Sequence, residues 1–158
     1  MLKFFKTVAK IFLFTILCFN FAYAADITGS GNEITEDSTV LQNINGNDTE
    51  ITVKNSATLE RGNNPIKTNT HLRATIVVES GATVSTSTGS NAIQAIDAGK
   101  GLSITNSGTV KAANSKAINL TDVEDGTLTN NSGGIIQANT NTISMLESDG
   151  DTTQYITI

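Results

Sequence analysis

A unit of about 25 residues recurs along most of this chain and constrains its fold more than any other feature. Its clearest copy spans residues 102–120, where three short segments alternate apolar and polar residues between small polar corners. Such alternation is typical of half-buried β-strands. A unit of this size cannot bury its apolar stripe alone, so the repetition predicts that successive units stack on one another.

Four serines mark the first corner of successive units and measure the repeat. Ser56, Ser80, Ser107 and Ser132 lie 24, 27 and 25 residues apart. Helical repeats have similar periods, but Thr, Asn, Gly and Val are poor helix formers. We therefore predict an all-β fold: a right-handed parallel β-helix, or β-solenoid, of about five rungs, with equivalent strands paired about 4.8 Å apart.

The residue types suit a narrow column of parallel strands. β-branched residues pack well on a pleated surface, and the following are predicted to face inward: Ile76, Val84, Ile104, Val110, Ile118, Ile135 and Ile143. Gly81, Gly108 and Gly133 recur at the first corner, where a positive φ is expected. Asn106 and Asn130 precede that corner, and asparagine tolerates the same conformations. In the unit that begins at Ile51, the third strand is expected over residues 69–74.

Two other structures would share parts of this composition. A disordered linker is also rich in Thr, Asn, Ser and Gly, but it has no reason to place Ile, Val and Leu at regular intervals. A globular domain with a conventional core draws heavily on aromatic side chains. After residue 24 the only aromatic residue is Tyr155, so ordered repeats are favoured over both.

The first 24 residues differ from the rest and predict a secretory signal peptide. Three lysines stand in the first ten residues, residues 11–22 are mostly apolar, and Ala22 and Ala24 supply the small residues of a cleavage site. A membrane anchor would need about 20 apolar residues. Lipid attachment at Cys18 would want a small residue before the cysteine, where Leu17 stands.

This leader implies a division of the chain and a destination. After the signal peptide at 1–24 we expect a flexible lead-in at 25–32, then solenoid repeats over 33–158 that end partway through a rung. Export through the inner membrane would place the mature chain at the cell surface or outside the cell, or in the periplasm if no translocator is present. No direct membrane insertion of residues 25–158 is expected.

The charge of the mature chain excludes some partners. Residues 25–158 carry seven basic and fifteen acidic residues, a net charge of −8. Nucleic acids and anionic membrane surfaces both require basic patches, so neither is an expected partner. The mature chain has no cysteine and therefore no disulfide framework.

The sequence contains no recognisable catalytic, cofactor-binding or metal site. His71 is the only histidine, and neither Gly-Asp-Ser-Gly nor Gly-x-Ser-x-Gly surrounds any serine. Polysaccharide-cleaving β-helices need clustered carboxylates on one face. The acidic residues here stand in turns, where either a solvated edge or a calcium ladder could result: Asp97, Asp122, Glu124, Asp125, Glu147, Asp149 and Asp151.

Two further patterns in the sequence do not predict a functional site. Thr-x-Thr pairs, which ice-binding solenoids display in ladders, occur at Thr68/Thr70, Thr86/Thr88, Thr127/Thr129 and Thr140/Thr142. Only the first and last share a position in the repeat, so no ladder of these pairs is expected. Three glycosylation sequons, which begin at Asn47, Asn119 and Asn130, are the chance matches of an Asn- and Thr-rich chain.

The segment Ile-Thr-Asn-Ser-Gly-Thr-Val at 104–110, with weaker copies at 53–59, 77–84 and 128–135, resembles the passenger repeats of bacterial autotransporters. The likeness covers roughly residues 33–158. It implies a right-handed β-helix passenger, exported by a signal peptide and displayed on the cell surface. It departs from that family in one respect, because nothing here fits the C-terminal outer-membrane barrel. The first part of such a protein, or a shortened relative, is therefore implied.

Three functions remain open at this point. The first is a non-enzymatic passenger or stalk of an autotransporter-like surface protein, which acts in adhesion or self-association. Its partners would be glycans or proteins on host or neighbouring cells, or other copies joined through the open C-terminal edge. The second is part of a carbohydrate-active β-helix protein. The third is a truncated, non-functional product.

Overall fold

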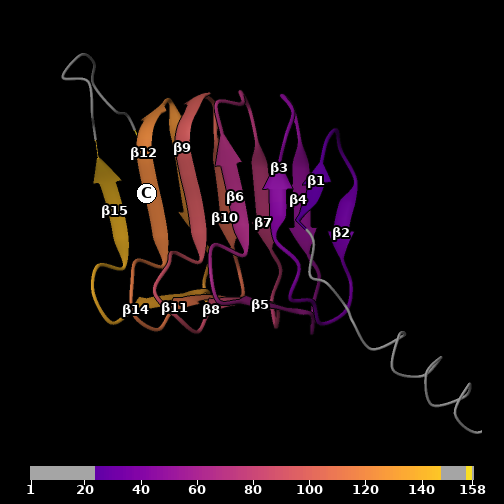
Figure 1. The fold of residues 1–158 in the computed structure, drawn as a ribbon, viewed down its shortest axis with the longest axis vertical. Coiled ribbons are helices and arrows are strands. Elements are labelled where there is room, and N and C mark those ends of the chain that lie inside the picture. The colour runs from indigo at the N-terminus through magenta and orange to yellow at the C-terminus, as the bar shows by residue number, and fades with distance from the viewer. Residues whose placement is uncertain (1–23, 147–155, 158) are drawn as a thin grey trace, which may run out of the picture.

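The computed structural model describes residues 24–146 and 156–157, and every regular element in this part is a β-strand. The strands form three parallel sheets around one apolar interior (Figure 1). Sheet A contains, in spatial order, β1 (Ala25–Ile27), β3 (Gln42–Ile44), β6 (Ile66–Asn69), β9 (Ile93–Lys100), β12 (Ile118–Glu124) and β15 (Ile143–Leu146). Sheet B contains β2 (Asn32–Ile34), β4 (Glu50–Val53), β7 (Thr75–Val78), β10 (Ser103–Asn106), β13 (Gly126–Asn130) and β16 (Ile156–Thr157). Sheet C contains β5 (Thr58–Arg61), β8 (Thr83–Thr86), β11 (Thr109–Ala112) and β14 (Ile135–Ala138).

The chain coils through the three sheets and confirms the predicted β-solenoid. Each strand pairs in parallel with the equivalent strand of the next rung, and about four complete rungs result. In Figure 1 successive rungs lie side by side across the picture. The strands of sheets A and B run upright, and sheet C lies along the lower edge of the view. The register of sheet B aligns Ile51, Ile76, Ile104 and Leu128, so successive rungs are 25, 28 and 24 residues long. None of the described residues belongs to a helix that could cross a bilayer.

Register places the apolar residues in continuous inward rows, as a narrow column of strands requires. Ten of these side chains, from all three sheets, are at most 1% exposed: Ile51, Ile76, Ile104, Leu128, Leu59, Val84, Val110, Ile66, Ile93 and Ile118. Five predicted core residues are among them. The prediction for Ile135 is wrong, because it pairs with Thr109 on the outer row and is 51% exposed. Ile136 takes the inward position instead, and Ile143 is only partly buried.

The corner between sheets B and C is usually a four-residue β-turn. Hydrogen bonds close it between Ala57 N and Lys54 O, between Ala82 N and Glu79 O, and between Gly134 N and Asn131 O. The third residue of each turn has a positive φ: Ser56 (71°), Gly81 (81°) and Gly133 (87°). The positive φ predicted for Gly81 and Gly133 is therefore confirmed. Ser56 holds the same conformation without being glycine, and Ser80 and Ser132 lie one position earlier in their turns.

The corner at Ser107 and Gly108 differs, because only these two residues join β10 to β11. Gly108 does not have the predicted positive φ. Its constraint is space, because a Cβ there would clash with the carbonyl oxygens of both Glu79 and Ala82. The Asn106 side chain bridges the short corner, since its Oδ1 accepts from Gly108 N at 3.2 Å. Its Nδ2 donates to Asn130 Oδ1 at 2.8 Å and to Ile135 O at 3.1 Å.

Part of the segment expected as a flexible lead-in, residues 25–32, belongs to strands β1 and β2. β1 pairs with β3 over three residues, and Ile27 is only 9% exposed. Asn32, at the start of β2, donates from Nδ2 to Glu50 O at 2.9 Å. Three residues of alternation are too few to distinguish a strand from a polar tail in the sequence, and here the parallel neighbour supplies the order.

One strand lies earlier than expected, and a short strand pairs near the end of sheet B. The third strand after β5 is β6, at Ile66–Asn69, and residues 70–74 form a corner instead of the strand predicted over 69–74. Thr68 occupies an inward position of β6, in register with Ile44 and Ala95, so the apolar pattern is interrupted there. At the other end, β16 pairs with β13 and begins a further passage through sheet B. Residues 1–23, on which the signal-peptide prediction depends, lie outside the described part.

Candidate functional site

A groove lies at the N-terminal end of sheet C, because that sheet begins one rung later than sheets A and B. Sheet C has β5 as its first strand, whereas sheets A and B begin at β1 and β2. In the first rung, residues 35–41 pass beside β5 and pair with it only at the bridge between Ser38 and Leu59. The chain then turns away to β3, which leaves a groove between residues 37–39 and the end of β5.

Backbone bonds fix the wall of this groove. Ser38 N donates to Thr58 O at 2.8 Å, and Glu60 N donates to Ser38 O at 3.0 Å. The Asp37 carboxylate accepts from Thr58 N at 2.8 Å. Ser38 Oγ accepts from Val40 N at 3.2 Å, which ends the pairing with β5. The wall is therefore held in place, and the backbone groups of β5 that face it are occupied at Thr58 O and Glu60 N.

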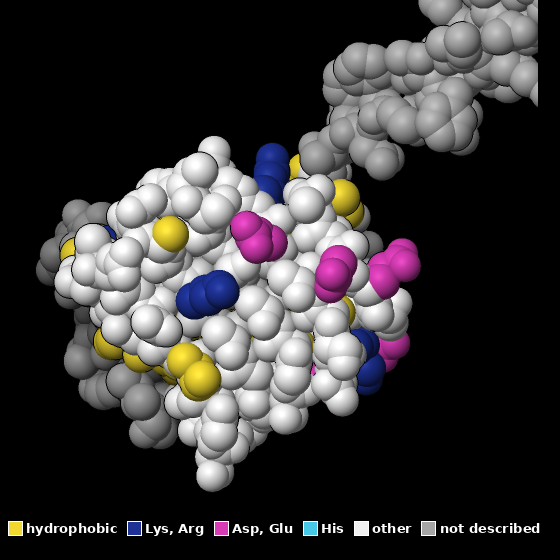
Figure 2. Space-filling model, turned by 90° about the horizontal axis from the view of Figure 1, so that it is seen from below, with side chains coloured by type: hydrophobic (Ala, Val, Ile, Leu, Met, Phe, Trp, Pro, Cys, Tyr) yellow, Lys and Arg dark blue, Asp and Glu magenta, His cyan; other side chains and the backbone are white. Residues whose placement is uncertain are grey.

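The groove has a volume of about 620 Å³, is open to solvent, and is lined by residues 37–39, Thr58, residues 60–62 and Ser87. This volume lies within the range of small-ligand sites, about 300–1,000 Å³. Four of the eight lining residues carry a hydroxyl group, two carry a carboxylate and one carries a guanidinium group. Figure 2 shows the molecule from the side of sheet C: most of the surface is uncharged and polar, and acidic side chains gather toward the β5 side.

Arg61 holds an unusual position in this lining. It is in register with Thr86, Ala112 and Ala138, so it occupies an inward row whose members in the next two rungs are small and buried. Because no strand lies on its other side, Arg61 is partly exposed at the open end of sheet C. Within residues 24–146 and 156–157, no carboxylate lies within ion-pair distance of its guanidinium.

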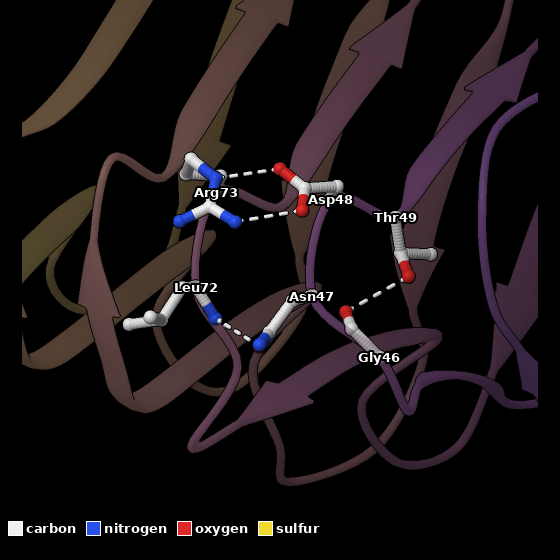
Figure 3. Close-up of polar contacts among 6 residues, drawn as sticks. All are labelled: Gly46, Asn47, Asp48, Thr49, Leu72 and Arg73. Carbon is white, nitrogen blue, oxygen red and sulfur yellow. Dashed lines mark hydrogen bonds and ion pairs between the residues drawn. The ribbon is translucent and has the colours of Figure 1, made fainter.

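A second polar cluster joins two corners between sheets A and B and serves the fold (Figure 3). Arg73 donates from Nε and Nη2 to the Asp48 carboxylate at 2.5 and 2.7 Å. Leu72 N donates to Asn47 Oδ1 at 2.9 Å, which links the same corners. The hydrogen bond from Arg73 lowers the pKa of Asp48, and the same contact raises the pKa of Arg73. These bonds tie the corner at Asn47 and Asp48 to the corner at Leu72 and Arg73.

His71 belongs to the second of these corners and is partly buried. It stands beside Arg73 in the chain, as the sequence already indicates. No group of three His, Cys, Asp or Glu side chains within the described ranges is arranged to hold a metal ion.

The prediction that the acidic residues of the sequence stand in turns is wrong for three of them, because Asp97 lies within β9 and Asp122 and Glu124 lie within β12. Asp125 alone stands between β12 and β13, and the described carboxylates form no group arranged to hold a metal ion. Asp97, Asp122 and Asp125 have positive φ values of 46°, 51° and 48°, which explains short polar residues at these points. Glu124 pairs with Lys100 at 3.3 Å. The remaining members of the predicted acidic edge, Glu147, Asp149 and Asp151, lie outside the described residues.

Sheet B displays two outward rows of mostly short side chains, and the Thr-x-Thr pattern of the sequence does not predict them. One row contains Glu50, Thr75, Ser103 and Thr127, and the other contains Glu33, Thr52, Val77, Thr105 and Thr129. Thr127/Thr129 therefore stacks on Ser103/Thr105, not on another Thr-x-Thr pair. The face is regular and polar, but charge and valine interrupt it. This face therefore presents regularly spaced short side chains to a partner.

Comparisons with protein-family models, curated proteins and solved structures found no significant match to this chain. The groove, the corners and the outward rows are therefore interpreted from their own geometry.

Proposed function

We propose that this chain is an exported, non-enzymatic β-solenoid that serves as the passenger or stalk of an autotransporter-like surface protein. Its role would be adhesion to glycans or proteins on other cells, or self-association. The observation that carries the proposal is the regular column itself, whose rungs present outward rows of short polar side chains along sheet B. A column of repeated rungs sets a distance between two ends and offers a long surface, both of which suit a stalk.

Two features of the sequence support export and display. The basic and apolar leader at 1–24 has the organisation of a cleavable signal. The repeats at 104–110 and their copies resemble autotransporter passengers. The mature net charge of −8 favours partners other than nucleic acid or anionic lipid.

Export is tested by expressing the full chain with a C-terminal epitope tag in a Gram-negative host and separating the cell fractions. We expect a processed chain outside the cytoplasm whose first residue is Ala25. A matched variant, Leu13→Arg, places a charge in the apolar run and should leave the unprocessed chain in the cytoplasm. Unprocessed wild-type chain in the cytoplasm would contradict the proposal.

Adhesion is tested with the exported chain immobilised on beads. We expect the beads to bind bacterial or animal cells, or one another, more than beads that carry a cytoplasmic protein of the same net charge. Cleavage of polysaccharides by the same preparation would instead favour a carbohydrate-active protein. Beads that bind neither cells nor one another would contradict the adhesive role.

A further inference from the structure

We infer that the groove beside β5 is a binding site for a neutral oligosaccharide. The inference rests on the proposed adhesive function and deepens it, because it names the chemical class of the partner and the place where it binds. Three features of the groove support it: the functional groups of the lining, their charges, and the hydrogen bonds already made by the β5 backbone.

The lining offers hydrogen-bond donors and acceptors side by side. Arg61 supplies guanidinium donors, Glu60 supplies carboxylate acceptors, and the hydroxyls of Thr39, Thr58 and Ser87 can do both. A sugar ring carries neighbouring hydroxyls that each donate and accept. Planar groups with two polar atoms, such as a carboxylate or a guanidinium, match such pairs of hydroxyls. The mixture therefore fits a polyol better than a ligand that only accepts or only donates.

The charge balance favours a neutral ligand. An anionic ligand would meet the carboxylates of Asp37 and Glu60, and a cationic ligand would meet Arg61, which has no carboxylate partner among the described residues. A neutral polyhydroxylated ligand avoids both repulsions. It also gives the Arg61 guanidinium the acceptors that no described carboxylate supplies.

The β5 backbone argues against the main competitor, an added peptide strand. Strand addition needs a free row of N–H and C=O groups on the edge. Here Ser38 already bonds to Thr58 O and Glu60 N, and Asp37 accepts from Thr58 N. The chain itself occupies the edge as far as Glu60 N, so only the last residue of β5 is left for an added strand.

The site lacks one feature of tight sugar binding, and this sets the expected affinity. None of the described residues that line the groove is aromatic, so none of them can stack a ring on the sugar. We expect a dissociation constant of about 1 mM for a single site. Adhesion would then come from many copies that act together on one surface.

The experiment is an amide-shift titration by NMR on the exported, ¹⁵N-labelled chain as recovered from the host. The probes are five neutral trisaccharides: maltotriose, cellotriose, laminaritriose, mannotriose and chitotriose. At least one should shift the amides of residues 37–39, 58–62 and 87 in a saturable way. Arg61→Gln and Glu60→Gln should each weaken that binding about tenfold, the value of one charged hydrogen bond.

The control variant is Lys111→Gln, which changes an exposed charge two strands away on the same sheet and should leave binding unchanged. Thermal unfolding followed by circular dichroism checks that each variant is folded. The inference is overturned if none of the five sugars shifts these amides, or if Arg61→Gln and Glu60→Gln bind as the wild type does. Stronger binding of trigalacturonate or of an acidic hexapeptide would also overturn it. An exported, cell-binding chain that fails this titration would lose the sugar site and keep the proposed function.

Discussion

The corner between sheets B and C is stabilised by ion pairs in the N-terminal rungs and by one buried amide, that of Asn106, in the C-terminal rungs. In the first, Lys54 Nζ lies 2.7 Å from the Glu79 carboxylate and 3.5 Å from that of Glu33, and Glu79 also accepts from Asn55 N. These side chains are about one third to one half exposed. In the second, Asn106 is fully buried and bonds along the column to Asn130.

The difference shows how one repeat position can use two kinds of chemistry. Exposed ion pairs are screened by water and salt and contribute little. A buried amide that loses its partners leaves groups that water cannot reach, so its loss costs much more. The C-terminal corner should therefore depend on its specific residues, whereas the N-terminal corner should tolerate change.

The largest effects should be equal in the two regions, because the core rows run through both. Ile51→Ala and Ile104→Ala each remove a side chain that is at most 1% exposed, and each should lower the free energy of unfolding by about 2–5 kcal/mol. Urea denaturation followed by circular dichroism measures both. A loss below about 0.5 kcal/mol for either would remove that residue from the core.

The next effect belongs to the short corner alone. Gly108→Ala puts a Cβ against two backbone oxygens that cannot move aside, and should cost about 3 kcal/mol. Gly89→Ala is the control, because a Cβ there meets nothing within 4 Å and should change stability little. Equal unfolding midpoints for these two variants would show that the short corner can relax.

Asn106→Ala tests the buried amide directly. It removes four side-chain bonds and leaves Gly108 N, Gly108 O and Ile135 O without this partner, so we expect a loss of about 2 kcal/mol. Asn131→Ala, at an exposed position of the neighbouring rung, removes one bond to Ser107 Oγ and should cost far less. If the two variants unfold at the same urea concentration, burial does not determine how much an amide contributes to the free energy of unfolding.

Ser56→Gly should raise stability, in contrast to the changes above. Ser56 has a φ of 71°, which costs a residue with a Cβ about 1 kcal/mol that glycine avoids. Ser80→Gly is the matched control in the next rung, since Ser80 does not have a positive φ. A midpoint for Ser56→Gly at or below that of the wild type would contradict the assignment of this strain.

Lys54→Gln should give the smallest effect, and its pH dependence identifies the cause. The hydrogen bond from Lys54 lowers the pKa of Glu79, so this contribution is present above the ordinary glutamate pKa and is lost as the pH falls through the lowered value. Wild type and variant should therefore converge in thermal midpoint at about pH 2 and in about 1 M salt. The Asn106→Ala difference should persist in high salt, and a Lys54→Gln difference that also persists would contradict the ion-pair explanation.

The sequence predicts the column well because its rows are made of β-branched residues at a spacing of two. The reference unit at 102–120 coincides with β10, β11 and the start of β12. Where a polar residue faces inward, as Thr68 does in β6, the pattern loses its signal and the strand is misplaced. The serine alignment also does not show that one corner is shorter. Ser80 and Ser132 lie in four-residue turns, whereas Ser107 lies in a corner of two residues.

The groove could not be read from the sequence, because it results from a strand that is missing in the first rung of sheet C. No motif marks it, and its lining comes from residues up to 50 positions apart. One signal was available: Arg61 stands where the later copies carry Thr86 and Ala112. A cation at an inward position of a repeat indicates an open end or a site, and recognising it requires the register.

Parallel pairing of every strand with its neighbours along the axis also determines how the molecule responds to a pulling force. Tension applied to the two ends would peel the rungs away one at a time, since each is bonded only to the next, and each release would free about 80 Å of chain. A column of this kind would lengthen in steps under load, one rung at a time.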